Sequence, residues 1–219
     1  MTYQIPPDIA RDAVLWVNVL YSTNPEAQRR AATAICVLMK NNSNNQTRYS
    51  TGEVKDALVN VLNSTRSGAQ FWAAATICNL TRDNPDNKKL FGTDEVKQAL
   101  DNVLMSTCPD ARRLAVSAIC NLTRGNLDNK KLFGTDEVKQ ALVNVLYSTN
   151  PEAQRWAASA ICNLTRGNLD NKKLFGTDEV KQALVNVLYS TNPEAQRWAA
   201  SAICNLTRGN LDNKKLFGT

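Results

Sequence analysis

The chain has 219 residues, a net charge of +6 and a sequence pI of about 9.1. This moderate basicity favours acidic partners, but it is weaker than the concentrated charge of a dedicated nucleic-acid binder. The sequence has no apolar run near the ~20 residues that a membrane-spanning helix needs, and its start lacks the basic and apolar segments of a signal peptide. We therefore expect a cytoplasmic or nuclear protein with no membrane partner.

One 42-residue sequence recurs along the chain in a fixed register. Residues 135–176 and 177–218 are identical, and residues 93–134 differ from them at seven positions. A fixed period of this size is typical of a stacked repeat array, in which each unit contacts only its neighbours. We therefore expect residues 1–219 to form one elongated domain, with its function on a face that all units share. The expected units are 9–50, 51–92, 93–134, 135–176 and 177–218, after an extension of residues 1–8.

Each unit is expected to contain three helices, which are clearest near the end of the chain. Residues 168–175 lie between two glycines and predict a short helical segment capped by its first Asn. Residues 178–190 have apolar side chains at the i, i+3, i+4, i+7 spacing of an amphipathic helix. Residues 193–208 follow an Asn-Pro-Glu start signal and end at Gly209, which predicts a long helix of about four turns that stops at a left-handed residue.

Six cysteines are present, and five of them recur at the repeat period. Each of the five lies in an alanine-rich helical segment, where thiols usually behave as small buried hydrophobic groups. With no CxxC pair and no histidine, the sequence offers no zinc site, so we expect free thiols, no metal and no cofactor. It also lacks a phosphate-binding glycine loop and a base for a cysteine nucleophile, and we therefore expect no catalysis. The recurring cysteines are Cys36, Cys78, Cys120, Cys162 and Cys204, and Cys108 is the sixth.

The helical pattern resembles an armadillo repeat. The segment PEAQRWAASAICNL, from Pro193 to Leu206, matches the family's third helix without gaps, and NxxNKxLF is similar to its first helix. HEAT repeats are the nearest alternative, but they normally have two helices per unit and lack the Asn before Leu. The resemblance covers residues 9–218. It implies an all-α, right-handed superhelical solenoid of three-helix armadillo-type repeats, whose third helices line a concave groove for an extended peptide.

In the armadillo family, the Asn before Leu clamps the main chain of the bound peptide. Val37 stands at this position in the first repeat, so the clamp should be missing there. An Asn side chain donates and accepts hydrogen bonds at once, and a column of them suits sequence-independent binding of an extended strand. The alternative is that each Asn only caps or solvates its helix. The four asparagines at this position are Asn79, Asn121, Asn163 and Asn205.

A column of tryptophans is predicted on the same helix face, about two turns before the asparagines. The spacing of Glu194, Trp198, Ser201, Asn205 and Arg208 places them on one stripe of the long helix. The Trp stands where armadillo repeats usually carry a Glu, and a Ser replaces the family's own Trp three residues later. The Trp then either flanks side-chain pockets of the groove or packs against the adjacent repeat. The columns contain Trp72, Trp156 and Trp198, and Ser117, Ser159 and Ser201.

A basic column follows three residues after the asparagines. Loss of the family's Glu column and gain of these cations should reverse the charge preference of the groove, because Arg binds carboxylate or phosphate in a forked geometry. We therefore expect an acidic or phosphorylated peptide, as for catenin-like armadillo proteins, rather than a lysine-rich nuclear-import signal. The alternative is contact with helix C-terminal carbonyls or with an Asp of the next repeat. The column contains Lys40, Arg82, Arg124, Arg166 and Arg208.

Two other functions remain open from the sequence. The Arg column, together with the Lys pairs expected on a solvated outer edge of the short helices, would suit a nucleic-acid binder that tracks phosphates. The identical last repeats and the apolar flank of the last long helix would suit a structural, self-assembling or engineered array with end-to-end contacts between chains. The Lys pairs are Lys88-Lys89, Lys130-Lys131, Lys172-Lys173 and Lys214-Lys215.

Overall fold

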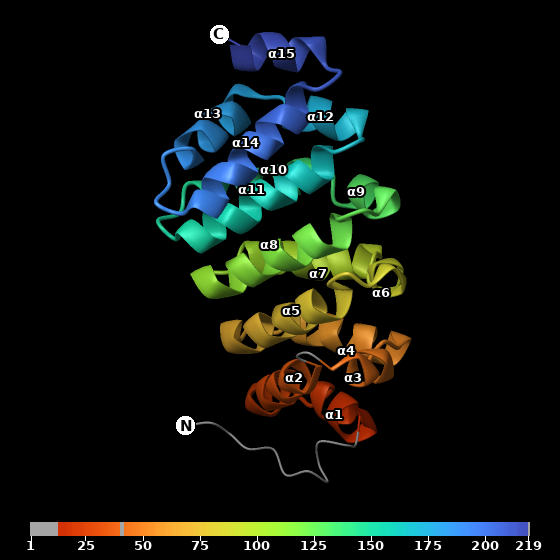
Figure 1. Ribbon diagram of the computed structural model, residues 1–219. Helices are drawn as coiled ribbons and strands as arrows, with labels where there is room; N and C mark the ends of the chain where they lie inside the picture. Colours follow the sequence, from red (N-terminus) through yellow and green to blue (C-terminus); the bar gives the residue numbers. More distant parts are fainter. Residues whose placement is uncertain (1–12, 40–41, 219) are drawn as a thin grey trace. The chain divides into compact units, whose positions relative to one another are not determined.

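The computed structural model describes residues 13–39 and 42–218, and every regular element in this part of the chain is an α-helix (Figure 1). The predicted all-α class is therefore confirmed. None of the described helices is long and apolar enough to cross a membrane. The structure divides into two compact units, Met1–Ala118 and Ile119–Thr219, and each is described by itself. Lys40, which was predicted to belong to the basic column, lies outside the described residues.

In the first unit, medium, long and short helices follow one another along the chain. The long helices α2 and α5 pack side by side, and the medium helices α1 and α4 each pack against the long helix that follows them. The helices are α1 (Ala13–Leu20), α2 (Pro25–Met39), α3 (Ser43–Arg48), α4 (Gly52–Leu62), α5 (Ser67–Thr81), α6 (Pro85–Leu90), α7 (Asp94–Leu104) and the first part of α8 (Pro109–Thr123).

The second unit continues the same order. Its long helices α11 and α14 pack along each other, α10 and α13 pack against them, and the short helix α15 lies against α14. The helices after α8 are α9 (Leu127–Leu132), α10 (Asp136–Leu146), α11 (Pro151–Thr165), α12 (Leu169–Phe175), α13 (Asp178–Val187), α14 (Pro193–Thr207) and α15 (Leu211–Gly218).

Side-chain caps and glycines set the helix ends. Thr135 and Thr177 accept hydrogen bonds from the N–H groups three residues later at the starts of α10 and α13, and such a cap contributes about 1 kcal/mol. Asn192 caps α14 in the predicted way, with Pro at the first helical position. Gly167 and Gly209 end the long helices with φ of 69° and 70°. The predicted left-handed stop at Gly209 is confirmed.

Small side chains allow the long helices to pack closely. Ala157, Ala158 and Ala160 of α11 and Ala199 and Ala202 of α14 are fully buried. All six cysteines are free thiols, as expected. Four of the five recurring cysteines are buried, whereas Cys204 is exposed on α14. The long helices α11 and α14 therefore meet through a layer of small side chains that includes the thiol of Cys162.

Candidate functional site

The asparagines predicted to clamp a peptide instead direct their amide nitrogens toward the preceding long helix. In the second unit, the Nδ2 of Asn163 donates to the carbonyl oxygen of Cys120 at 3.2 Å and lies 3.3 Å from its Sγ. Asn205 repeats this arrangement with Cys162, at 3.1 Å to each atom. Asn163 is only 4% exposed and Asn205 only 9%. These amides therefore join successive repeats, a role that the sequence analysis did not consider.

The other two asparagines of the column are also at least partly buried. In the first unit, Asn79 is half-buried and its Nδ2 lies 3.3 Å from the Sγ of Cys36. In the second unit, Asn121 is buried. Val37, in the place of an Asn, is 54% exposed. Among the described residues, none donates a hydrogen bond to the side-chain oxygen of Asn163 or Asn205. Each of these two amides can still accept a hydrogen bond.

The predicted serines also belong to the contact between repeats. The Oγ of Ser117 lies 3.1 Å from the Sγ of Cys78, and the Oγ of Ser159 lies 3.2 Å from the Sγ of Cys120. Both serines are buried, and only Ser201 is half-buried. The expectation that all three line a peptide groove is therefore not met at Ser117 and Ser159, because the adjacent long helix packs over them.

The thiol of Cys162 lies within this contact. Burial raises the pKa of Cys162, and the nearby Arg166 cation only partly opposes this rise. A thiol with a raised pKa remains protonated at neutral pH and is a poor nucleophile. Among the described residues, no group of three or more Cys, Asp or Glu side chains could hold a metal ion.

Two of the predicted tryptophans form stacked clusters with a neighbouring Arg and Glu, of which only Glu194 was predicted on the same stripe of the helix. The guanidinium of Arg155 lies 4.2 Å from the ring centre of Trp156 and pairs with Glu152 at 2.9 Å. Arg197, Trp198 and Glu194 repeat the arrangement one repeat later, with the guanidinium 4.9 Å from the ring centre. The sequence signal for both clusters is a Glu three residues before an Arg that directly precedes the Trp.

These stacks neutralise the acidic groups beside each Trp. A cation over an indole contributes about 0.5–1 kcal/mol at an exposed site, and the Trp remains half-buried with its ring at the surface. In the first unit, Trp72 is half-buried and instead packs edge-on against Phe71, with ring centres 5.0 Å apart. The face beside Trp156 and Trp198 therefore carries aromatic surface without a net negative charge.

The predicted arginine column is the most accessible part of the site. Arg82, Arg166 and Arg208 are exposed, and Arg124 is half-buried. The Nη2 atoms of Arg166 and Arg208 lie 3.7 and 3.5 Å from the thiols of Cys162 and Cys204, which are weak hydrogen-bond partners. Neither Arg166 nor Arg208 pairs with a carboxylate among the described residues. Both guanidiniums are thus available to an anionic ligand.

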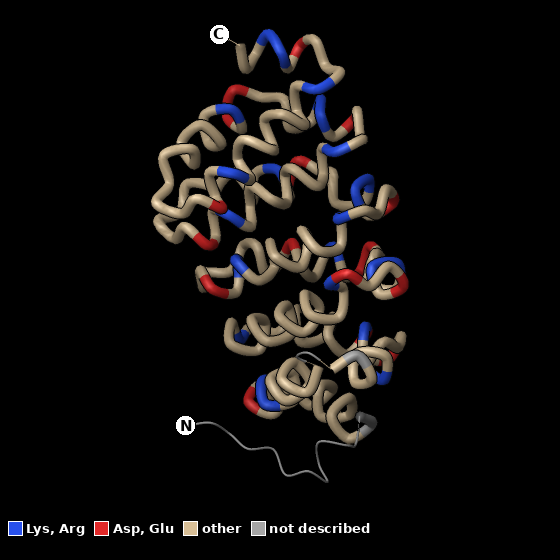
Figure 2. The backbone as a smooth tube through the Cα atoms, viewed as in Figure 1, with Lys and Arg blue, Asp and Glu red and all other residues tan. Residues whose placement is uncertain are grey.

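The lysine pairs differ from the prediction. Pairs of lysines recur on the short helices α9, α12 and α15 (Figure 2). However, Lys130 is 5% exposed and its Nζ donates to the Arg166 carbonyl at 2.6 Å, and Lys172 binds the Arg208 carbonyl in the same way. Burial lowers the pKa of Lys130, as does the nearby Arg166. The expected solvated edge is therefore wrong for the first lysine of these two pairs and for the buried Lys88.

A second asparagine in each short helix was also missed. The Nδ2 of Asn171 donates to the Lys130 carbonyl at 2.8 Å and to the Leu164 carbonyl at 3.0 Å, and Asn213 forms the equivalent bonds one repeat later. A Cβ added to Gly134 would lie 2.1 Å from the Oδ1 of Asn171. At Gly134 and Gly176, the absence of a side chain therefore makes room for the Asn of the next repeat.

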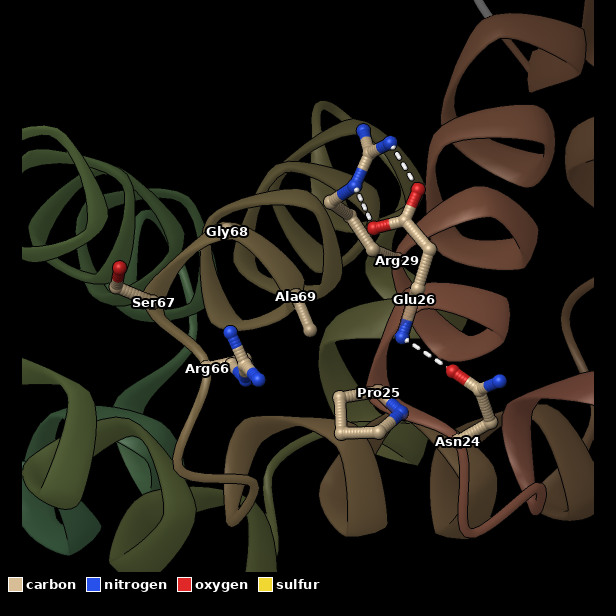
Figure 3. Close-up of a pocket in the computed structure, with 8 residues that line it drawn as sticks. All are labelled: Asn24, Pro25, Glu26, Arg29, Arg66, Ser67, Gly68 and Ala69. Atoms are coloured by element: carbon tan, nitrogen blue, oxygen red, sulfur yellow. Dashed lines mark hydrogen bonds and ion pairs between the residues drawn. The ribbon is translucent and has the colours of Figure 1, made fainter.

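A hollow of about 310 Å³ lies in the first unit, between the starts of α2 and α5 (Figure 3). Its walls include Asn24, which caps α2, and Arg29, which pairs with Glu26 at 2.6 Å. Arg66 stands at the start of α5 without a side-chain capping bond. None of the residues predicted from the sequence lines this hollow, so it is separate from the candidate site.

Comparison with known proteins finds solved structures with a similar fold. No protein-family model and no curated protein matches the sequence. An engineered protein is similar at 26% identity with a TM-score of 0.86, over 93% of this chain and 83% of that one. A designed armadillo repeat protein is 20% identical with a TM-score of 0.85, over 94% and 87% of the two chains. A second designed armadillo repeat protein, in complex with peptide (KR)4, is 20% identical with a TM-score of 0.83, over 93% and 85%.

Proposed function

We propose that this chain, which has an armadillo-like repeat fold, is a non-catalytic scaffold that binds an extended acidic peptide of another protein. The proposed site lies on the long helices α11 and α14 of the second unit. The observation that carries the proposal is the pair of exposed guanidiniums, Arg166 and Arg208, which occupy equivalent positions and pair with no carboxylate among the described residues.

Each group of the proposed site has a distinct task. Arg166 and Arg208 bind carboxylates in a forked, charge-assisted geometry. The rings of Trp156 and Trp198 supply flat apolar walls for the side chains between those carboxylates. The side-chain oxygen of Asn163, which accepts no bond from the described residues, receives a main-chain N–H of the peptide. The Nδ2 of that amide already donates to Cys120. In the proposed clamp, Asn163 therefore only accepts a hydrogen bond from the peptide and donates none.

Charge distinguishes this site from that of the designed neighbour with the (KR)4 peptide. Here Glu152 and Glu194 are paired with Arg155 and Arg197, whereas Arg166 and Arg208 are not paired with a carboxylate. A basic peptide would meet uncompensated cations, and an acidic peptide would compensate them. Specificity should therefore rest on repulsion of basic sequences as well as attraction of acidic ones.

Fluorescence anisotropy with two labelled peptides of equal length, one rich in Asp and Glu and one rich in Lys and Arg, tests this proposal. We expect the acidic peptide to bind at least about tenfold more tightly. Arg166→Gln with Arg208→Gln should weaken its binding by about tenfold or more, because two charge-assisted contacts are lost.

The control is Lys131→Gln with Lys173→Gln, which removes the same net charge from two exposed side chains on the short helices. We expect this double variant to bind the acidic peptide almost as well as the unchanged protein. Equal losses in the two double variants would show that only net charge matters and would contradict the proposed site.

Nucleic-acid binding has weaker support than peptide binding. The first lysine of three pairs, Lys88, Lys130 and Lys172, is buried, so only the second lysine of each of these pairs could contribute to a phosphate-tracking stripe on the short helices. Titration of single-stranded RNA at two salt concentrations separates the two functions. Tight RNA binding with a steep salt dependence, combined with no binding of the acidic peptide, would favour the nucleic-acid function instead.

A further inference from the structure

The outer flank of α14 has the same sequence as the flank of α11, and α14 itself covers that flank of α11. Residues 135–176 and 177–218 have the same sequence, and α11 packs against α14. Ala158 and Cys162 of α11 are fully buried, whereas the equivalent Ala200 and Cys204 of α14 are exposed. The same loss of cover affects Ile203, Leu188 and Phe217, which are half-buried although their counterparts Ile161, Leu146 and Phe175 are fully buried.

A specific empty space accompanies this uncovered flank. The Oδ1 of Asn213 lies 2.0 Å from the point where a Cβ on Gly176 would stand, so this Asn fills the space beside that glycine. Gly218 is the equivalent glycine one repeat later, and no atom lies within 4 Å of its Cβ position. The uncovered flank therefore has the same apolar surface, and the same space beside a glycine (the notch), with which residues 135–176 contact the last repeat.

Among the polar contacts that join the last repeat to the one before it, three involve donors that recur in the first repeat. The Oγ of Ser190 donates to the Oε1 of Gln154 at 2.7 Å, and the Nδ2 of Asn192 donates to the Oε1 of Glu152 at 2.9 Å. The Nδ2 of Asn213 donates to the Lys172 carbonyl at 2.8 Å. The equivalent acceptors on the uncovered flank are Gln196, Glu194 and the Lys214 carbonyl.

The first repeat of the chain carries the same three donors at the same repeat positions. Ser22, Asn24 and Asn45 correspond to Ser190, Asn192 and Asn213. Asn24 is exposed, and Ser22 and Asn45 are half-buried. The Nδ2 of Asn45 donates to the Leu38 carbonyl at 2.8 Å, as Asn213 does to the Leu206 carbonyl at 3.0 Å. The side chain that would enter the notch is thus already held in the same local arrangement.

One of the differences between the first and last repeats, at the position of the recurring Asn, suits a contact between separate chains. Val37 replaces the recurring Asn and is 54% exposed, although it is apolar. Against an exposed thiol such as Cys204, a valine removes apolar surface from water without leaving an amide unpaired.

We propose that two copies of this chain associate head to tail, with the first repeat of one copy packed on the α14 flank of the other. The contact is heterologous, since it joins two different surfaces, and each pair of chains leaves one surface of each kind free for further copies. The proposal is independent of the peptide site, which lies at Arg166, Arg208 and the tryptophans.

Sedimentation velocity over a range of concentrations tests this proposal. The unchanged protein should form species at multiples of its 24.2 kDa mass as concentration rises. Ala200→Glu and Val37→Glu should each raise the dissociation constant by more than about tenfold, because each buries an unpaired carboxylate in the contact. Both positions are exposed in a single chain, so folding should be unaffected. Thr149→Glu, at an exposed loop position, is the charge-matched control and should associate normally.

Sedimentation velocity of a mixture of the two variants gives the most decisive result. Ala200→Glu retains an intact first repeat and Val37→Glu retains an intact α14 flank, so the mixture should form a one-to-one pair and nothing larger. Monomers of the unchanged protein at every concentration would overturn the proposal. Undiminished self-association of Val37→Glu would also overturn it, because that result would indicate a symmetric contact between two α14 flanks.

Discussion

At the scale of single residues, two glycines with identical local sequence have different surroundings. Gly176 lies against Asn213, and Gly218 lies beside empty space. The φ of Gly176 is −82°, which any residue adopts, so its need for glycine comes from the close approach of Asn213 and not from the backbone. The comparison of Gly176 with Gly218 therefore shows that glycine is needed at Gly176 because Asn213 packs against it, and not because of its backbone conformation.

We predict that Gly176→Ala lowers the free energy of unfolding by about 2 kcal/mol, because it displaces Asn213 and leaves a buried amide without its partners. Gly218→Ala, the matched control, should change stability by less than about 0.5 kcal/mol when measured in dilute solution. Chemical denaturation followed by circular dichroism measures both. In an Asn213→Ala background, the added Gly176→Ala should cost little, and a full cost there would contradict the explanation.

Adjacent lysines provide a second comparison at the residue scale. The buried Lys130 donates to the Arg166 carbonyl, whereas Lys131 is exposed. We predict that Lys130→Ala lowers the free energy of unfolding by about 1–3 kcal/mol, through loss of a charged hydrogen bond and of the packed aliphatic stem. Lys131→Ala should have an effect within about 0.5 kcal/mol. Thermal denaturation compares the two, and equal midpoints would contradict the structural role of Lys130.

At the scale of elements, the contact between long helices depends on one amide per repeat. Asn163 and Asn205 donate to the cysteine of the preceding helix, and Ser159 lies against Cys120 in the same layer. An apolar layer of alanines alone would allow adjacent helices to slide past each other. Directional bonds at fixed positions define their register.

We predict that Asn163→Asp lowers the free energy of unfolding by about 2–3 kcal/mol, because the variant has no donor and places a carboxylate near the Cys120 carbonyl. Asn186→Asp is the control, since this asparagine is exposed on α13. Urea denaturation should show a lower midpoint for the first variant only. An unchanged midpoint for Asn163→Asp would indicate that the amide is free to serve a peptide at both of its ends.

The sequence predicts the elements better than it predicts the direction of their side chains. Helix starts and stops depend on neighbours within one helix, so Asn192, Pro193 and Gly209 identified α14 correctly. The hydrogen-bond partners of Asn163 and Lys130 lie in an adjacent repeat. Periodicity along a single helix does not indicate which residues of an adjacent repeat lie within hydrogen-bond distance. Both residues were therefore predicted on the right helix but with the wrong surroundings.

At the scale of the whole chain, repeats of one sequence experience different environments. Cys162 is buried and Cys204 is exposed, although 42 residues of identical sequence surround each of them. In a repeat array, stability is close to a sum of terms for each repeat and each contact between neighbours. Function can then reside only in side chains that these contacts leave accessible, which here include Arg166, Arg208 and the two stacked tryptophans.

The most direct test of the proposed function is the titration of the isotope-labelled protein with an acidic peptide, followed by NMR. We predict the largest shifts at the indole N–H signals of Trp156 and Trp198 and at the side chains of Arg166 and Arg208. The amides near the exposed Leu169 and Lys173 of the short helix α12 should stay unchanged. Shifts confined to the short helices, or stronger shifts with a basic peptide, would contradict an acidic-peptide site on α11 and α14.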